Sequence, residues 1–396
     1  MSDEIFNGQL TRRDLLRRGA AVGGALTLPG ILAACGGTSK KTAAGETSHH
    51  LAKTLHFSNW TLYMDTNKKK HTNPSLIDFQ RKYGVHVQYT EDINDNASFF
   101  AKIQGPLSRG QSTGRDLIVS TDNDRYLALL IKKGWVEKLD KSAIPNIKNL
   151  IDVQRHPSFD PNREYSLPWQ SGMTGIAYND KLTGPVLSID DLFGNPKLKG
   201  KITCLNSMGD ALGLVMLANG DDPSHVTDKT FNKAMAVIQK AVNSRQIRQF
   251  TGNDYAPPLA KGDLSAAMSW SGDITQLGDP HIHWNVPTDG GDIWTDNVLI
   301  PKGGNVYTAS VYMNYVYDPK VQALMEGGDP KIGDTGIYYI CDVKGTKQWV
   351  EKINPKVANN PLIFPTKKML DSVHIFDTNA LNNQKYITAW QNLVSA

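Results

Sequence analysis

Cysteine, long apolar runs and charge of one sign are all scarce in this sequence. Three cysteines, Cys35, Cys204 and Cys341, occur among 396 residues. Beyond the first 35 residues, no apolar run reaches the roughly 20 residues that a membrane-spanning helix needs, so we expect a soluble body. Lys and Arg (43) nearly balance Asp and Glu (39). A chain so close to neutral does not carry the basic surface typical of nucleic-acid binding.

Motifs of catalysis and metal binding are missing as well. Residues 194–201 have the glycines and lysine of a phosphate-binding loop, but their spacing is too long and Ile202 stands where Ser or Thr must hold magnesium. His281 and His283 have no third ligand at metal-binding spacing. A Gly-x-Ser-x-Gly stretch occurs at 110–114, but the segment after it is expected to be a strand and not the helix that follows a nucleophile turn. We therefore expect a protein that is not an enzyme and that uses no cofactor or metal.

The N-terminus has the features of an export signal. Residues 11–17, Thr-Arg-Arg-Asp-Leu-Leu-Arg, have the twin-arginine form, and an apolar run at 19–32 follows that is too short to cross a bilayer. Leu-Ala-Ala-Cys-Gly at 32–36 is similar to a lipobox, whose cysteine becomes the lipidated first residue. We expect a signal at 1–35 that ends at a lipidated Cys35, and a flexible tether at 36–53.

This signal predicts a protein that is anchored by lipid to the outer face of the cytoplasmic membrane or lies in the periplasm. In that oxidising setting Cys204 and Cys341 could form a disulfide. Alternatively, each could be a small buried hydrophobic residue. The sequence leaves both interpretations open.

The body that follows, roughly 350 residues, is long enough for two domains. Strand patterns alternate with helix patterns along it, which predicts an α/β fold with largely parallel sheets flanked by helices. Extended segments at 166–179 and 292–301 could carry the chain between two lobes. We expect strands at 54–57, 85–89, 116–120, 201–205, 264–270 and 282–286, and helices at 73–84, 97–107, 125–133, 210–217, 229–242, 254–261, 320–325, 345–353 and 387–393.

The first strand delivers large aromatic side chains into a turn. Leu55 and Phe57 alternate with polar neighbours, and Ser-Asn at 58–59 favours a turn. Trp60 and Tyr63 follow directly. Open α/β sheets bind ligands at the ends of their strands, so these aromatics could line a cleft for a small cationic solute. Burial in the core is the alternative, because aromatic residues dominate protein cores.

Several short motifs, taken together in their order, resemble a known family. They are Asn-Trp-Thr-Leu-Tyr at 59–63, Asp-Leu-Ile-Val-Ser-Thr at 116–121, Tyr-Ser-Leu-Pro at 165–168, Met-Ser-Trp-Ser-Gly at 268–272 and Trp-Thr-Asp-Asn at 294–297. Through them the sequence resembles the spermidine/putrescine-binding proteins of bacterial ABC transporters, across nearly all of the mature chain. The resemblance implies a two-lobed periplasmic-binding-protein fold of type II, each lobe a mixed, mostly parallel sheet flanked by helices. It places lobe 1 at 54–172 and 297–348, and lobe 2 at 173–296 and 349–396.

The resemblance also implies a function and a set of ligand-binding residues. The protein would be a monomer that captures a polyamine, putrescine or spermidine, between its lobes and delivers it to an ABC permease. The implied residues are the aromatic side chains Trp60, Tyr63, Trp270, Trp294 and Tyr339, the acids Asp122, Asp210 and Asp296, and the hydroxyl side chains Thr61, Thr121 and Ser207. Leu62 and Ser207 stand where the family often has acids, which favours a diamine over a triamine.

The chemistry of a polyamine suits this set, because aromatic faces cover methylenes and attract ammonium groups, which carboxylates also bind. Two other functions stay open. One is binding of another small cationic or quaternary-ammonium solute, such as a betaine. The carboxylate of a betaine would favour an Arg in the cleft, and no Arg stands next to the aromatic residues in the sequence. The other is a surface-anchored enzyme on the same fold, for which no nucleophile–base pair is evident.

Overall fold

The computed structural model describes residues 49–395, within the compact unit Thr47–Ala396. The expected export signal, Cys35 and residues 36–48 of the tether lie outside the described residues. The strands are β1 (Thr54–Trp60), β2 (Thr66–Asn67), β3 (His86–Ile93), β4 (Leu117–Thr121), β5 (Ser166–Asn179), β6 (Ile202–Leu205), β7 (Ile247–Thr251), β8 (Ala266–Trp270), β9 (Ile282–Asn285), β10 (Gly291–Leu299), β11 (Asp334–Thr335) and β12 (Val373–His374).

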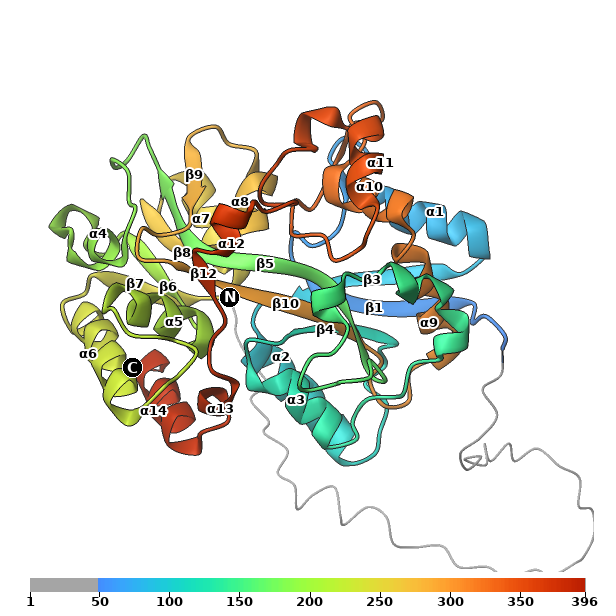
Figure 1. Cartoon of the computed structure of the whole chain (residues 1–396), viewed down its shortest axis with the longest axis horizontal. Helices are drawn as coiled ribbons and strands as arrows, with labels where there is room; N and C mark the ends of the chain where they lie inside the picture. Colours follow the sequence, from blue (N-terminus) through green and yellow to red (C-terminus); the bar gives the residue numbers. More distant parts are fainter. Residues whose placement is uncertain (1–48, 396) are drawn as a thin grey trace, which may run out of the picture. The chain divides into compact units, whose positions relative to one another are not determined.

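Ten of these strands form one large mixed sheet in the order β3-β1-β4-β10-β5-β8-β6-β7, with β12 beside β10 and β9 beside β5, and β2 pairs with β11 in a separate two-stranded sheet. Strand β1 runs parallel to β3 and β4, and β6 runs parallel to β7 and β8. Pairing is antiparallel where β4 meets β10, β10 meets β5 and β5 meets β8. The sheet therefore has two parallel groups, which we call the β1 half (β3-β1-β4) and the β6 half (β8-β6-β7), on either side of β10 and β5 (Figure 1).

The two long strands β5 and β10 hold the halves together. They pair with each other from Asp292 opposite Thr174 to Leu299 opposite Ser166. Every residue of β5 except Tyr178 is buried, as is every residue of β10 except Ile293. Two neighbouring strands in the middle of a sheet are covered on both faces, which accounts for their near-complete burial. The expected extended segments at 166–179 and 292–301 are thus confirmed as strands, and they lie side by side.

The helices pack around both halves. In Figure 1, α1, α10 and α11 lie on one side of the β1 half with α2 and α3 on the other, and α5, α6 and α14 gather beside the β6 half. The helices are α1 (Pro74–Tyr83), α2 (Asn96–Ser108), α3 (Arg125–Lys132), α4 (Ile189–Gly194), α5 (Met208–Ala218), α6 (Asp228–Asn243), α7 (Ala256–Lys261), α8 (Ser271–Leu277), α9 (Val306–Val316), α10 (Pro319–Gly327), α11 (Thr346–Ile353), α12 (Lys367–Leu370), α13 (Thr378–Leu381) and α14 (Gln384–Val394).

The sequence patterns missed two helices that matter for the site. Helix α9 is buried on several sides, including Thr308, Tyr312 and Tyr315. A helix without a polar face shows no amphipathic stripe in its sequence. Helix α8 is only seven residues long and begins directly after β8. The prediction for β1 was also short, because this strand continues to Trp60 between β3 and β4.

Aromatic packing holds the middle of β1 in place. The ring of Phe57 packs edge-on against Trp169 at 5.3 Å and against Tyr312 at 5.6 Å between ring centroids. Phe79 of α1 packs on the same Tyr312 at 4.9 Å. These rings are buried and carry much apolar area, so they anchor β1 firmly against α1, α9 and β5.

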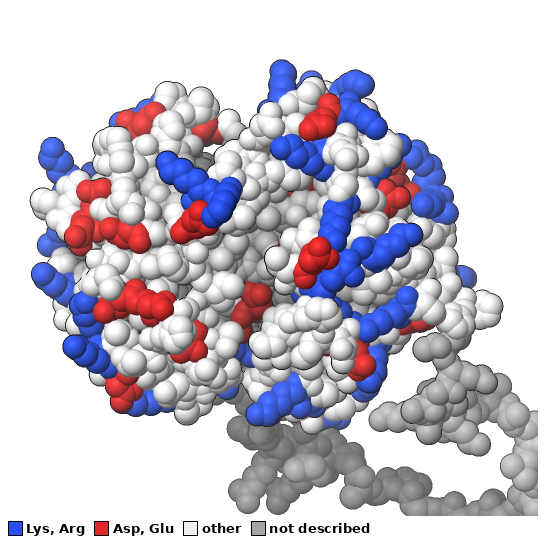
Figure 2. Space-filling model, in the orientation of Figure 1, with Lys and Arg blue, Asp and Glu red and all other residues white. Residues whose placement is uncertain are grey.

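Cys204 and Cys341 are both buried free thiols, so the structure supports the second interpretation of these residues. None of the helices in residues 49–395 combines the length and the apolar character needed to cross a membrane. On the face shown in Figure 2, Lys and Arg are interspersed with Asp and Glu over the whole surface.

Candidate ligand-binding site

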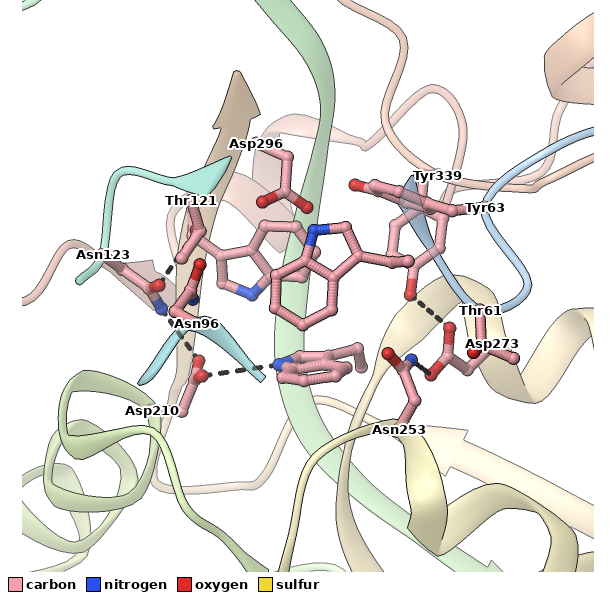
Figure 3. Close-up of a pocket in the computed structure, with 13 residues that line it drawn as sticks. Thr61, Tyr63, Asn96, Thr121, Asn123, Asp210, Asn253, Asp273, Asp296 and Tyr339 are labelled. Atoms are coloured by element: carbon pink, nitrogen blue, oxygen red, sulfur yellow. Dashed lines mark hydrogen bonds between the residues drawn. The ribbon is translucent and has the colours of Figure 1, made fainter. Parts of the chain in front are cut away.

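A pocket, which we call the cavity, lies where the β1 half meets the β6 half, with about 330 Å³ of space free of protein atoms, including the solvent at its opening. Figure 3 shows its walls, which come from the ends of β1, β4 and β8, from the first turns of α2, α5 and α8, from β10, and from the segment between α10 and α11. Its lining residues are Trp60, Thr61, Tyr63, Asn96, Thr121, Asn123, Asp210, Asn253, Trp270, Asp273, Trp294, Asp296 and Tyr339.

Strand register brings the floor of this cavity together. Asp292, Trp294 and Asp296 are alternate residues of β10, so their side chains share one face of the sheet. Opposite them on β5 stand Thr174, Gly172 and Gln170. Thr121 of β4 pairs with Asp296, and Trp270 of β8 pairs with Thr174. Four strands from both halves therefore present side chains on a single surface.

The five predicted aromatic residues form one cluster in the cavity. Trp60 packs edge-on against Trp270 at 5.6 Å between centroids, and Trp270 packs against Trp294 at 6.3 Å. Trp294 lies 5.9 Å from Tyr339, which packs edge-on against Tyr63 at 4.8 Å. Each ring is at most 8 % exposed. The two interpretations of these residues, core and cleft wall, therefore both hold: the rings are buried and they also line the cavity.

Gly172 makes room for the ring of Trp294. A Cβ atom at this position would lie 2.4 Å from Cη2 of Trp294, well inside contact distance. The indole can therefore lie flat over β5, and its Nε1 donates to Oγ1 of Thr174 at 2.9 Å. The orientation of the Trp294 ring therefore depends on the absence of a side chain at Gly172.

Asp296 is the acid with the fewest partners in the cavity. Its carboxyl group is 3 % exposed, and its Oδ1 has no hydrogen-bond partner among the described residues. Burial raises its pKa well above the ordinary value, and the nearby Tyr63 hydroxyl offsets this only in part. Figure 3 shows this hydroxyl facing Asp296. A buried carboxyl in such surroundings needs a cation to be charged at neutral pH.

Asp210 lies on another side of the aromatic cluster (Figure 3). Its Oδ1 accepts hydrogen bonds from Thr174 and from Nδ2 of Asn123 at 2.9 Å, and Nε1 of Trp270 reaches its Oδ2 at 3.4 Å. Asn123 also donates to Asp292 at 3.1 Å, beneath the cavity. Burial raises the pKa of Asp210. The pKa of Asp292 is raised well above its ordinary value, first by burial and then by repulsion from the neighbouring Asp210 carboxylate.

A third acid, Asp273 on α8, was not predicted. Its carboxylate accepts hydrogen bonds at 2.7 Å each from Tyr255, Tyr339 and Asn253. Burial raises its pKa to about 6, and these three donors limit the shift. Asp273 stands three residues after Trp270, so one helical turn carries it to the cavity wall. The sequence analysis did not single out Asp273 because helix α8 was not predicted.

Two predicted residues do not line the cavity. Asp122 accepts a hydrogen bond from the Thr295 backbone at 2.8 Å and lines a separate hollow with Asp124 and Phe159. Thr121 at the end of β4 and Asn123 in the following turn line the cavity, whereas the Asp122 side chain between them is directed to the Thr295 backbone. Ser207 caps α5 by accepting from the Asp210 backbone at 3.4 Å, and it lines an adjacent hollow.

The other nine predicted residues all line the cavity: Trp60, Thr61, Tyr63, Thr121, Asp210, Trp270, Trp294, Asp296 and Tyr339. The prediction missed Asn96, Asn123, Asn253 and Asp273. Among the lining residues of the described chain are three acids and no Lys, Arg or His. Aromatic faces and carboxylates without a basic side chain make a cavity that favours an organic cation.

The fold is that of a bacterial solute-binding protein. The family model described as "bacterial extracellular solute-binding protein" matches residues 114–330, more than half of the chain. The chain therefore belongs to this family, a family of solute-binding proteins and not of enzymes.

Individual relatives are similar over most of their length. The spermidine/putrescine-binding periplasmic protein of Escherichia coli is 26 % identical, over 87 % of this chain and 88 % of its own. The putrescine-binding periplasmic protein SpuD of Pseudomonas aeruginosa is 27 % identical, over 87 % of this chain and 92 % of its own.

Solved structures show the same two-lobed periplasmic-binding-protein fold, which confirms the predicted fold class. A lipoprotein of Treponema pallidum superposes with a TM-score of 0.67 at 22 % identity, covering 87 % of this chain and 100 % of its own. A spermidine/putrescine substrate-binding protein of Streptococcus pneumoniae gives 0.65 at 19 % identity, covering 86 % and 97 %.

The close approach of Trp294 to Gly172 predicts the effect of adding one methyl group. Gly172→Ala would force the indole or β5 to move and should lower the free energy of unfolding by about 1–3 kcal/mol. Urea unfolding followed by tryptophan fluorescence measures this change. Gly194→Ala is the matched control, because its added Cβ meets nothing within 4 Å. Equal unfolding midpoints for the two variants would contradict the role given to Gly172.

Proposed function

We propose that this protein is the solute-binding component of an ABC importer and captures a polyamine, putrescine or spermidine, between its two halves. The observation that carries the proposal is Asp296, a buried carboxyl with an unpartnered oxygen, set among indole and phenol rings with no basic side chain in the cavity. An alkyl ammonium supplies the missing cation, and its methylenes cover the rings. The relatives named for spermidine and putrescine support this assignment.

The interactions on offer are strong enough for useful affinity. A cation–π contact contributes about 0.5–2 kcal/mol, and a hydrogen bond to a carboxylate contributes about 1.5–3 kcal/mol. Micromolar binding needs about 8 kcal/mol in total. Five aromatic faces and two carboxylates offer interactions of this order, from which the costs of association are subtracted.

The distribution of acids favours a diamine. Asp273 has three strong internal donors, whereas Asp296 has an unpartnered oxygen and Asp210 is only weakly engaged at Oδ2. Two available acids on different sides of the aromatic cluster match the two ammonium groups of putrescine. We therefore assign putrescine as the preferred ligand and spermidine as the weaker one.

The cellular role follows from the same assignment. The chain would be exported by the twin-arginine route, lipidated at Cys35 and held at the membrane as a monomer by the tether at 36–53. Lobe 1 (54–172 and 297–348) and lobe 2 (173–296 and 349–396) would close on the ligand, and the closed form would dock on the permease. Closure shifts an existing equilibrium, and we assign no catalytic step to this protein.

Binding of a different small cation is the second candidate, and the acids discriminate between the two. A quaternary ammonium group such as that of a betaine can bind to aromatic faces but cannot donate a hydrogen bond to Asp296. Calorimetry with putrescine, spermidine, choline and glycine betaine tests both candidates. Tighter binding of a quaternary amine than of putrescine would support the alternative, and tighter spermidine binding would contradict the diamine assignment.

Neutralising Asp296 should separate binding from stability. Asp296→Asn removes the charge that pairs with the ligand, so putrescine affinity should fall at least about tenfold, which corresponds to the lower end for a charged hydrogen bond. The unfolding temperature of the ligand-free protein should stay equal or rise, because a buried carboxyl no longer has to be accommodated. The exposed Asp371→Asn is the control for net charge. Unchanged putrescine affinity in Asp296→Asn would exclude this carboxyl as a ligand contact.

Binding should also depend on pH. The pKa of Asp296 is raised well above its ordinary value and that of Asp273 to about 6 by burial, whereas the ligand amines stay protonated up to about pH 10. A bound ammonium favours the carboxylate form, so binding releases protons, and affinity is lost as the pH falls through the pKa of the free site. Calorimetry from about pH 8 to about pH 5, in buffers of different ionisation enthalpy, measures both effects. Constant affinity without proton release would contradict the model.

A further inference from the structure

Helix α8 lies at the boundary of the two halves and contacts the β1 half through its last turn. It follows β8 of the β6 half, and in Figure 1 it lies next to the segment between α10 and α11. Gln276, near its C-terminal end, is 5 % exposed. Its Nε2 donates to the backbone oxygen of Leu62 and to that of Ile337 at 3.2 Å. One side-chain amide thus bonds two loops of the β1 half.

A further contact comes from the same loop that contains Leu62. Nζ of Lys68 donates to the backbone oxygen of Gln276 at 3.0 Å. This oxygen is at the C-terminal end of α8, where carbonyl groups lack helical partners and favour a cation. The residues around Gln276 therefore both donate to and accept from the β1 half.

The two loops that Gln276 contacts are those that present tyrosines to the cavity. Leu62 directly precedes Tyr63, and Ile337 stands two residues before Tyr339. Leu62 and Tyr338 each have a φ of 57°, in the left-handed region that residues other than glycine rarely adopt. Backbone in this conformation persists only where the surroundings hold it. The Gln276 amide is part of what holds it, and Tyr63 and Tyr339 then meet edge-on.

We propose that Gln276 is a positioning residue that couples closure of the two halves to assembly of the tyrosine wall of the cavity. The inference rests on the proposed function for its ligand. When the halves separate, the amide and both carbonyl groups turn to water, so these bonds exist only in the closed form. Gln276 then stabilises the closed, ligand-bound protein without touching the ligand, and it acts after the first encounter.

The chain offers a matched control for this role. Gln246 is also 5 % exposed, and its Nε2 also donates to two backbone oxygens, those of Leu192 at 3.0 Å and Asn195 at 2.9 Å. All three of these residues lie beside the β6 half, so the Gln246 bonds do not cross between halves. Gln246→Leu and Gln276→Leu remove the same kind of interaction, but only Gln276→Leu removes bonds that cross between the two halves.

The experiment compares the two variants in the full-length protein with putrescine and spermidine as probes. Gln276→Leu should weaken amine binding about tenfold, mainly through faster dissociation in stopped-flow tryptophan fluorescence. Its ligand-free unfolding temperature should stay near that of the wild type. Gln246→Leu should do the reverse, with a lower unfolding temperature and unchanged affinity. Gln276→Glu, which keeps the length but opposes two carbonyl groups with a carboxylate, should weaken binding at least as much as Gln276→Leu.

The outcomes separate this inference from the proposed function. If the wild type binds an amine and Gln276→Leu binds it equally well, Gln276 has no role in closure. A fall in unfolding temperature matching that of Gln246→Leu, without loss of affinity, would make it a structural residue only. If the wild type binds neither amine, the proposed ligand is wrong, and the two variants are compared with the wild type using choline and glycine betaine as probes. Weaker binding of either probe by Gln276→Leu alone then supports the closure role, and equal binding overturns it.

Discussion

The antiparallel pairing of β5 with β10 is the constraint on which the rest of the site depends. These strands lie between the two halves of the sheet and join them, and their register places Trp294 over Gly172 and Asp296 beside Gln170. Because side chains alternate along a strand, a slip of one residue would turn all of these groups to the opposite face. The near-complete burial of both strands holds this register in place, so the floor of the cavity is as rigid as the core. The flexible contributions come from loops that meet this floor from either half.

Buried acids are the second organising feature. Asp210, Asp273, Asp292 and Asp296 are each at most 3 % exposed, and burial raises the pKa of every one of them. Burying carboxyl groups close together costs free energy unless cations or hydrogen-bond donors compensate. Tyrosine, asparagine and threonine donors compensate for part of this cost at Asp210 and Asp273. Asp296 is left with the least compensation, which agrees with the ammonium contact proposed for it.

Sequence reasoning reached the parts of this structure that repeat a local pattern. The α/β alternation predicted most strands and helices, and the family resemblance singled out the aromatic cluster and Asp296. It could not reach features that depend on tertiary context. Helix α9 has no polar face to reveal it, and α8 is too short to show periodicity, so Asp273 and Gln276 went unnoticed. Asp122 was predicted wrongly as a cavity residue because it lies in the turn after β4, where no strand periodicity tells which of two neighbouring side chains faces the cavity.

Glycines at the boundary let the two halves approach each other closely. A Cβ on Gly252 would lie 2.0 Å from the backbone oxygen of Asn94, and one on Gly209 would lie 2.6 Å from that of Asn123. Both glycines belong to the β6 side, and both oxygens belong to loops of the β1 side. Backbone can approach backbone this closely only where no side chain intervenes. The hydrogen bonds of Gln276 and Asn123 can therefore form at the same time, because glycines let the two surfaces meet at several points around the cavity. A ligand in the proposed site would therefore be enclosed by main chain as well as by aromatic rings.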